Sequence, residues 1–347
     1  MTMKAAQFFD RKDIRVVDID EPQISEKQQV KIAVKYAGIC GSDLHEYLGG
    51  PIFVPADEPH PYSGVKAPLT MGHEFSGEVV EVGEGVTSVK VGDPVTVEPI
   101  LAKDGLQGDY NLDPHLGFVG LASNGAFTEY VVVDEDQVHI LPEGIDFEQG
   151  ALTEPAAVAL YAVRNSALKA GDTAAVFGCG PIGLLTIDAL KAAGATDIYA
   201  VELSKERQEK AEELGAIIVD PNEGDPVEKI HDLAGGPVDF SFEVTGVPVV
   251  LQQALDAIKN GGECVVISIW ETGAEIKPNE LVIKEKTMKG IIAYRHIFPE
   301  VLKLMQAGYF QKEDFVTAHI KVEDIVEKGF EALAHEKKQV KIMVEPK

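Results

Sequence analysis

The sequence has few cysteines and no long apolar segment. Its three cysteines, Cys40, Cys179 and Cys264, are too few for a disulfide framework and fit a reducing compartment. It has no run of about 20 apolar residues, the length that a membrane-spanning helix needs. The first residues, MTMKAAQ, lack the apolar core of a signal peptide. We therefore expect a cytoplasmic protein that does not act at a membrane.

Basic residues are also scarce. The chain has 31 Lys and Arg against 57 Asp and Glu, a formal net charge of −26. This charge repels nucleic acids and anionic membranes, so we expect neither as a partner. An anionic cofactor must then be held by local geometry and not by the field of the whole protein. We interpret the acidity itself as a source of solubility.

The pattern of apolar residues changes along the 347 residues and predicts two domains. Residues 1–155 contain short alternating segments typical of β-strands, which predict a partly closed barrel. We expect these strands at 13–19, 29–36, 77–83, 92–97 and 126–133. Residues 156–293 alternate strand and helix and predict an α/β fold, a Rossmann doubly wound parallel sheet. Residues 294–347 are expected to pack back on the first domain.

A glycine fingerprint follows the first strand of the α/β region. Gly178-Cys179-Gly180-Pro181-Ile182-Gly183 lies between a buried strand and a helix, which favours a dinucleotide site. Glu202 ends the next strand, at about the distance along the chain where an acid binds the adenosine ribose. A carboxylate there repels a 2′-phosphate, so we predict NAD and not NADP. Arg207, also a candidate cofactor-binding residue, is a possible signal against this NAD preference; we prefer to interpret it as a solvated residue on the following helix.

A cysteine, a histidine and acidic residues beside glycines suggest a metal site. Thiolate, imidazole and carboxylate groups together suit zinc. The candidates are Cys40, His73 and Glu154. Each has a simpler alternative: a buried thiol, a hydrogen-bonded core histidine, and a cap on the helix that starts near Pro155.

The chain resembles the zinc-dependent medium-chain dehydrogenase/reductase family over nearly its whole length. The resemblance is carried by GICGSDLH at 38–45, GHEFSGEV at 72–79, EPAAVA at 154–159, the glycine fingerprint and the closing Lys341-Ile342. It implies a GroES-like catalytic domain at 1–155, completed by 294–347. It also implies a Rossmann NAD-binding domain at 156–293.

The resemblance also implies roles for individual residues. Cys40, His73 and Glu154 would hold a catalytic zinc ion that keeps one position open for water or substrate. Glu74 would be the neighbouring carboxylate that can bind or release the metal, and it is the rival of Glu154 as third ligand. Asp43 would orient the His73 ring.

The expected reaction is a reversible hydride transfer between a secondary alcohol and NAD. Ser42 and His45 would carry the alcohol proton to water, because imidazole titrates near neutral pH. Their simpler alternatives are a turn hydroxyl and a surface histidine.

One departure from the family concerns a second zinc. Many members carry four clustered cysteines that bind a structural zinc, but residues 101–113 contain none here. We therefore expect one zinc ion per chain and no structural zinc with four cysteine ligands. A homodimer or homotetramer is the expected assembly.

Several loops favour one substrate class within the family. Residues 45–55, 59–61 and 292–296 resemble the subgroup that interconverts 2,3-butanediol and acetoin and reduces diacetyl. Tyr47, His60 and Arg295 are candidates for the second substrate oxygen. A polyol dehydrogenase of the sorbitol type is the alternative. A non-catalytic, NAD-binding zinc protein is a more distant one.

Overall fold

The computed structural model describes residues 2–336 and 338–347. The chain forms two compact units: unit 1 comprises Met1–Pro155 and Phe298–Lys347, and unit 2 comprises Ala156–Ile297. The sequence pattern places the same changes at 155 and 294. Helix α9 begins at Phe298, so the chain re-enters unit 1 with a helix.

Unit 2 is built on a parallel sheet of six strands. Their order is β13-β12-β11-β14-β15-β16. The strands are β11 (Ala174–Phe177), β12 (Ile198–Val201), β13 (Ile217–Val219), β14 (Val238–Glu243), β15 (Ile258–Val266) and β16 (Thr287–Gly290). The order reverses between β11 and β14, which confirms the doubly wound sheet. Sheets of this kind bind ligands beyond the carboxyl ends of the strands at that reversal.

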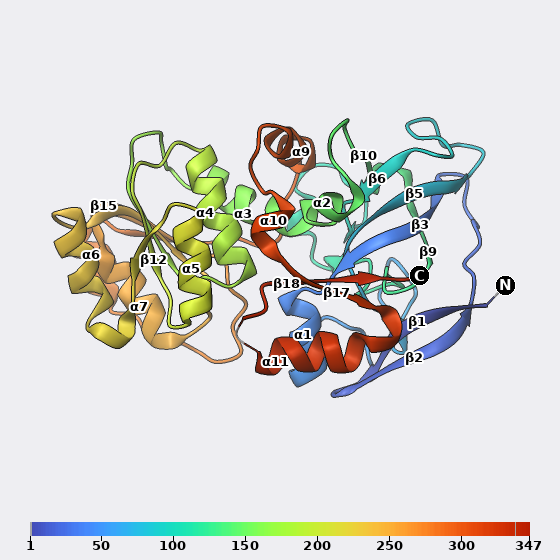
Figure 1. The fold of residues 1–347 in the computed structure, drawn as a ribbon, viewed down its shortest axis with the longest axis horizontal. Helices are drawn as coiled ribbons and strands as arrows, with labels where there is room; N and C mark the ends of the chain where they lie inside the picture. The colour runs from blue at the N-terminus through green and yellow to red at the C-terminus, as the bar shows by residue number, and fades with distance from the viewer. Residues whose placement is uncertain (1, 337) are drawn as a thin grey trace. The chain divides into compact units, whose positions relative to one another are not determined.

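Helices cover both faces of this sheet. Figure 1 shows α4 and α5 on one face and α6 and α7 on the other. The helices of this part of the chain are α3 (Thr153–Asn165), α4 (Pro181–Ala192), α5 (Lys205–Glu213), α6 (Pro226–Ala234), α7 (Pro248–Ala257) and α8 (Pro278–Lys284), with a 3₁₀ turn at Pro221–Glu223. Helices α4, α6, α7 and α8 begin with proline, whose fixed φ suits the first helical position. Strand β11 is buried throughout, as the apolar segment at 173–177 predicts.

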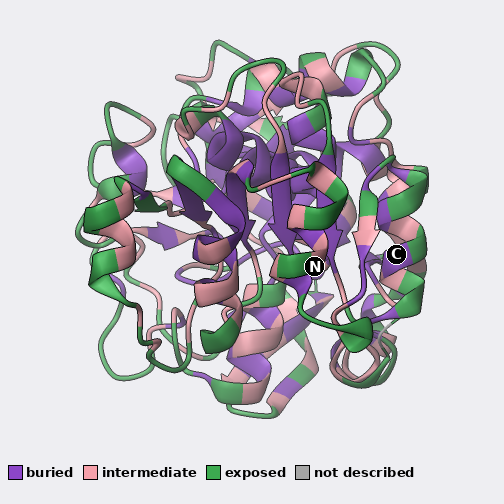
Figure 2. Cartoon of the chain, turned by 90° about the vertical axis from the view of Figure 1, so that its left-hand side faces the viewer, coloured by how far each residue is buried: buried purple, intermediate pink, exposed green. Residues whose placement is uncertain are grey.

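The core of unit 2 is formed by side chains of the sheet and of α6 and α7. Phe177 and Tyr199 of the sheet pack with Ile230 of α6 and Leu255 of α7. Figure 2 shows buried residues gathered on the strands and exposed residues on the outer faces of the helices and on the loops.

Unit 1 contains most of its strands in a seven-stranded sheet. The order is β10-β6-β5-β3-β18-β17, and β9 also pairs with β3. A smaller sheet has the order β2-β1-β4, and β7 pairs with β8. The strands are β1 (Thr2–Asp10), β2 (Asp13–Asp20), β3 (Gln29–Gly38), β4 (Leu69–Thr70), β5 (Glu74–Val82), β6 (Pro94–Val97), β7 (Ile100–Leu101), β8 (Gly117–Phe118), β9 (Tyr130–Asp134), β10 (Val138–Ile140), β17 (Val316–Lys321) and β18 (Lys341–Glu345).

The sequence predicts one partly closed barrel for unit 1. The structure divides the strands of this unit among a seven-stranded sheet and two smaller sheets. A bridge between Ala5 and Thr128 connects the region of β1 to the chain just before β9. The strand predicted at 126–133 begins only at Tyr130. Its first residues bond elsewhere, since the Ala126 amide donates to Gly72 O and the Phe127 amide to Met71 O.

The C-terminal segment packs on the N-terminal strands, as the sequence predicts. Strand β18 pairs antiparallel with β3, with Met343 opposite Gly38. The helices of unit 1 are α1 (Gly41–Gly49), α2 (Phe147–Ala151), α9 (Phe298–Gln306), α10 (Lys312–Phe315) and α11 (Ala332–His335), with 3₁₀ turns at Tyr110–Leu112, Glu135–Gln137 and Val322–Asp324 and a π-helix at Ile325–Glu331. Within the described residues, no helix combines the length and apolarity needed to cross a bilayer.

Candidate metal centre and nucleotide site

Two neighbouring strands bring the candidate metal ligands together. Gly38 at the end of β3 lies opposite Glu74 at the start of β5. Cys40, two residues beyond β3, therefore lies near His73, one residue before β5. Ligand atoms of Cys40, His73 and Glu74 lie within 4.8 Å of one another, and the two latter residues are buried. This pairing explains how motifs more than 30 residues apart form one site.

Glu154 does not belong to that group of three. It lies in the first turn of α3, where it is 4% exposed. Its charge still acts on Lys341, the residue whose ammonium group contacts Glu74. The geometry therefore brings Glu74, the rival carboxylate, closest to Cys40 and His73.

The His73 ring is held between two residues of α1. Its Nδ1 lies 3.4 Å from Asp43 Oδ1, and its Nε2 lies 3.2 Å from Ser42 Oγ. Asp43 Oδ2 also accepts a hydrogen bond from the Cys40 amide at 3.0 Å. Burial alone would lower the pKa of His73, but the Asp43 carboxylate and Cys40 raise it well above its usual value. Asp43 thus occupies the position of a residue that orients the ring.

A buried ion pair adjoins the cluster. Lys341 Nζ donates to both carboxylate oxygens of Glu74, at 2.7 and 2.6 Å, and to Ile39 O at 3.1 Å. Burial would lower the pKa of Lys341, but Glu74, Cys40 and Glu154 together raise it. The sequence reasoning used Lys341 only as a match to the family and gave it no role, because its partner lies 267 residues away.

The charges of this region fit a divalent cation. Asp43, Glu74 and Glu154 are all buried carboxylates, and Lys341 is the buried ammonium among them. Buried charges are costly unless they are paired, so a divalent ion would compensate the remaining negative charge. The donor set of sulfur, imidazole nitrogen and carboxylate oxygen suits zinc.

The proposed proton carriers lie on α1. Ser42 and His45 are separated by three residues, so they share one face of the helix. Both are half-buried, so each keeps some exposure to solvent.

A carboxylate that the sequence reasoning missed holds the loop after α1. Glu46 is fully buried and accepts hydrogen bonds from the amides of Ile52, Phe53 and Val54. In the sequence, the only signal for such a role is an acidic residue shortly before an apolar segment. The amides that it binds depend on the loop conformation.

The three candidates for the second substrate oxygen have other partners. The Tyr47 hydroxyl donates to Glu331 at 2.5 Å, and this bond is the main reason its pKa rises to about 12. His60 Nε2 lies 3.0 Å from His115 O. Arg295 belongs to unit 2 and lies over the Tyr161 ring. Each of the three thus has a partner within its own unit, and a contact with the second substrate oxygen stays a prediction.

The glycine fingerprint forms the turn from β11 into α4. Gly178 has a φ of +99°, which a residue with a side chain rarely adopts. A Cβ at Gly183 would lie 1.9 Å from Gly178 O, so only glycine allows the helix to start this close to the strand. A Cβ at Gly180 would meet no described heavy atom within 4 Å, so space remains beside the backbone. Pro181 opens α4 and Ile182 follows it, both half-buried.

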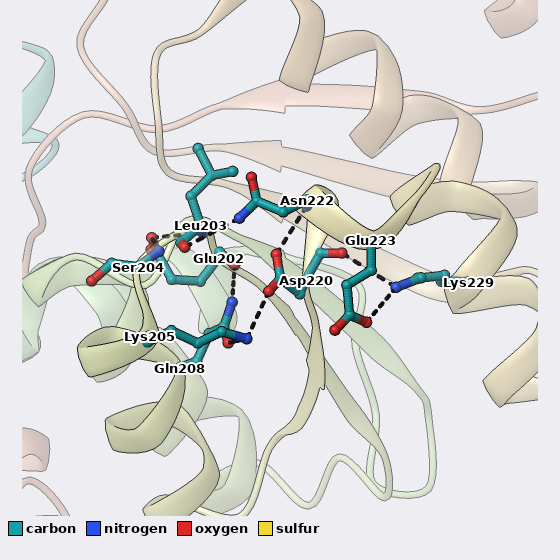
Figure 3. A network of polar contacts seen from close by, with 9 residues as sticks. All are labelled: Glu202, Leu203, Ser204, Lys205, Gln208, Asp220, Asn222, Glu223 and Lys229. Atoms are coloured by element: carbon teal, nitrogen blue, oxygen red, sulfur yellow. Dashed lines mark hydrogen bonds and ion pairs between the residues drawn. The ribbon is translucent and has the colours of Figure 1, made fainter.

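Glu202 connects this turn to the end of β12. Its carboxylate accepts hydrogen bonds from the amides of Cys179, Leu203 and Ser204, each at 2.8 Å. Figure 3 shows Glu202 at the centre of a polar network that extends to the end of β13. Arg207 Nε is buried and has no hydrogen-bond partner among the described residues. Its charge acts on the Cys179 thiol of the glycine turn, where it opposes the rise in pKa that burial causes.

Further residues near the strand ends were not found from the sequence. Glu243, the last residue of β14, is fully buried. It accepts hydrogen bonds from Thr245 N at 2.7 Å, from Gly246 N at 3.0 Å and from the Ser268 hydroxyl. Exposed apolar residues follow β12, β14 and β15 at this edge: Leu203, Val247 and Ile269. Large apolar residues exposed beside a glycine turn suit the flat rings of a dinucleotide.

Comparison with known proteins identifies the class that this fold and these clusters define. Residues 26–143 match the family model of the alcohol dehydrogenase GroES-like domain. Residues 181–307 match the model of the zinc-binding dehydrogenases. The chain belongs to the zinc-binding medium-chain dehydrogenases, and it is an oxidoreductase.

Individual relatives narrow the comparison. The (R,R)-butanediol dehydrogenase of Bacillus subtilis is 65% identical over 99% of this chain and 100% of its own length. The crystal structure of 2R,3R-butanediol dehydrogenase from Bacillus subtilis superposes with a TM-score of 0.97, covering 99% of this chain and 100% of the other. Sorbitol dehydrogenase of the same organism is 32% identical over 99% and 97% of the two chains. The comparison supports the butanediol interpretation over the sorbitol one.

Proposed function

We propose that this protein is an NAD- and zinc-dependent dehydrogenase that interconverts (2R,3R)-2,3-butanediol and acetoin and also reduces diacetyl. The group of Cys40, His73 and Glu74, in which only Cys40 is half-buried, carries the proposal, because its donor set suits a catalytic metal. The 65% identity to the Bacillus subtilis enzyme supports the substrate and its configuration.

Cys40, His73 and Glu154 are proposed to hold the single zinc ion. Glu154 is preferred over Glu74 because both oxygens of Glu74 are bonded to Lys341. When bound, zinc would act as a Lewis acid on the substrate oxygen. Asp43 Oδ1 lies 3.4 Å from His73 Nδ1 and would orient the ring so that Nε2 could bind the metal.

In the oxidation, the carbinol carbon gives up a hydride with its electron pair, and the hydroxyl oxygen gives up a proton. The hydride reduces NAD⁺ to NADH, which is the chemistry that the nicotinamide ring supplies. Ser42 receives the proton and passes it to His45, which releases it to water. The products are acetoin, NADH and one proton, and the reverse sequence reduces acetoin.

The nucleotide is proposed to bind at the carboxyl edge of the sheet in unit 2. Gly178, Gly180, Pro181, Ile182 and Gly183 present the helix N-terminus to the pyrophosphate. Glu202 accepts hydrogen bonds from the ribose hydroxyls and so favours NAD over NADP. Arg207 adds a positive charge beside the glycine turn.

The protein is proposed to act as a homo-oligomer in the cytoplasm. Strand β16 forms one edge of the six-stranded sheet, and all four of its residues are exposed. Val282 and Ile283 of the preceding helix are 74% and 75% exposed. An exposed strand edge next to apolar side chains suits pairing with a second copy. All three cysteines are free thiols, which is consistent with a reducing compartment.

The decisive experiment is a substrate panel of acetoin, diacetyl, the butanediol stereoisomers and sorbitol, each assayed with NAD or NADP in the direction that applies. We expect turnover of acetoin with NADH, (2R,3R)-butanediol as its product by chiral chromatography, and loss of activity with a zinc chelator. Faster turnover of sorbitol than of butanediol would favour the polyol alternative. An inactive protein that still binds NAD and zinc would favour the non-catalytic one.

The metal ligands are tested by zinc content per chain. Cys40→Ala, His73→Ala and Glu154→Gln should each lose zinc and activity while NAD still binds. Glu74→Gln is the matched control, since it also neutralises a buried carboxylate but should retain zinc. Loss of zinc in Glu74→Gln with retention in Glu154→Gln would reverse the assignment of the third ligand.

A further inference from the structure

Two acidic residues follow neighbouring strands at the edge of the sheet where the nucleotide is proposed to bind. Val201 at the end of β12 is paired in register with Val219 at the end of β13. The next residues along the chain are Glu202 and Asp220. Asp220 follows β13, the shortest strand of the sheet. It is only 7% exposed, so its side chain is largely buried.

Asp220 forms an ion pair with a lysine of the neighbouring helix. Lys205, the first residue of α5, donates from Nζ to Asp220 Oδ2 at 2.8 Å and to Gln208 Oε1 at 3.0 Å. Gln208 in turn donates to the Glu202 backbone oxygen at 2.6 Å. Figure 3 shows the ammonium group of Lys205 between the Asp220 and Gln208 side chains. Lys205 is therefore linked to Glu202 only through Gln208, and its ammonium group binds Asp220 at the end of β13.

A second cation of this network is also paired. Lys229 Nζ donates to Glu223 Oε2 at 2.8 Å and to the Asp220 backbone oxygen at 3.4 Å. A ribose 2′-phosphate placed at Glu202 would therefore meet one carboxylate directly and a second beside it. The two nearby ammonium groups already have carboxylate partners.

We propose that Asp220 is a second determinant of the preference for NAD over NADP, because it binds Lys205 and so withholds that cation from a 2′-phosphate at Glu202. This inference rests on the proposed nucleotide site. It predicts that Asp220 still disfavours NADP when the charge of Glu202 has been removed.

The test is a double-mutant cycle on the full-length protein, read by calorimetric binding of adenosine 2′,5′-bisphosphate and of 5′-AMP. All variants carry Glu202→Gln, which removes the charge and keeps an oxygen for the loop amides. To this background are added Asp220→Asn, Lys205→Met, or both. Thermal melting checks that each variant folds, and Asp220→Ser serves as a second variant at that position.

In the Glu202→Gln background, Asp220→Asn should raise affinity for the bisphosphate relative to 5′-AMP about fivefold, the scale of a partly exposed ion pair. Adding Lys205→Met should remove this gain, whereas the same change with Asp220 present should have little effect. The cycle isolates the coupling from a general charge effect. Glu223→Gln is the comparison variant: it releases Lys229 and leaves Lys205 on Asp220, so it shows whether release of any nearby ammonium group is enough.

Other outcomes would overturn the inference. An equal cost of Lys205→Met in both backgrounds would mean that Asp220 acts only through its charge. A gain in Glu223→Gln as large as in Asp220→Asn would mean that the effect is not specific to Lys205. Normal 5′-AMP binding with no coupling contradicts this inference alone, whereas loss of 5′-AMP binding in the unmodified protein contradicts the proposed nucleotide site.

Discussion

Replacement of Lys341 by methionine should destabilise the metal-free protein strongly. The Lys341 and Glu74 side chains are 2% and 0% exposed, and the ammonium group makes hydrogen bonds to both carboxylate oxygens. Lys341→Met leaves Glu74 as an unpaired buried charge. Breaking a buried pair in this way costs about 3–5 kcal/mol. At roughly 2–4 °C per kcal/mol for a domain of this size, the Tm should fall by roughly 6–20 °C.

Zinc should reduce that loss, because a divalent cation near Glu74 replaces part of the missing positive charge. The assay is thermal unfolding followed by circular dichroism, with chelator and with excess zinc. Adding Glu74→Gln to Lys341→Met should recover most of the stability, since no buried charge is then unpaired. Lys328→Met is the control, because it removes an exposed ion pair with Asp324 and should cost less than about 1 kcal/mol.

Two results would refute this reasoning. If metal-free Lys341→Met melts within about 2 °C of the unmodified protein, the pair carries no buried charge of consequence. If the double variant is no more stable than Lys341→Met, the loss comes from side-chain packing and not from Glu74. If Lys341→Met loses the same amount of stability with chelator and with zinc, bound metal does not compensate the charge of Glu74.

Two further predictions concern loops fixed by acidic residues. Glu243→Gln should raise the KM for NAD several-fold with a smaller change in kcat, because the charge that strengthens its bonds to the Thr245 and Gly246 amides is lost and one of its two acceptor oxygens becomes an NH₂ group; unchanged steady-state kinetics would contradict this. Burial would raise the pKa of Asp146, but the Gln149 amide and the Lys312 ammonium hold it below its usual value. A lowered pKa in the folded state means stability that is present above the unfolded pKa and is lost as the pH falls through the folded one. Asp146→Asn should therefore lower the Tm at pH 7, and the difference from the unmodified protein should shrink as the pH falls through the lowered pKa of Asp146; a difference that stays constant in acid would refute this.

The sequence allowed accurate prediction of features that depend on neighbours along the chain. The glycine fingerprint and the alternation of strand and helix in unit 2 are local patterns, and the observed elements agree within a few residues. The packing of the C-terminal segment on the first domain was also expected, and β18 pairs with β3. The strand expected at 126–133 was too long, because Ala126 and Phe127 bond to another segment that no local pattern reveals.

The candidate site was predicted only in part, because several of its contacts join distant segments. Cys40 and His73 were found as members of a family motif, and the pairing of β3 with β5 brings them together. The partner of Glu74 on β18 and the contact of Lys205 with Asp220 depend on strand register and side-chain reach. Neither can be read from residue type alone.

The acidity of the chain has a structural use beyond the solubility that the composition suggests. Glu46, Glu202 and Glu243 each accept hydrogen bonds from backbone amides of loops next to the candidate sites. A carboxylate accepts several amides at once, and such charge-assisted bonds are stronger than neutral ones. A loop organised in this way needs no metal or disulfide to fix its shape. Replacing these acids by their amides should therefore alter ligand binding, whereas the same change at exposed acids should alter only net charge.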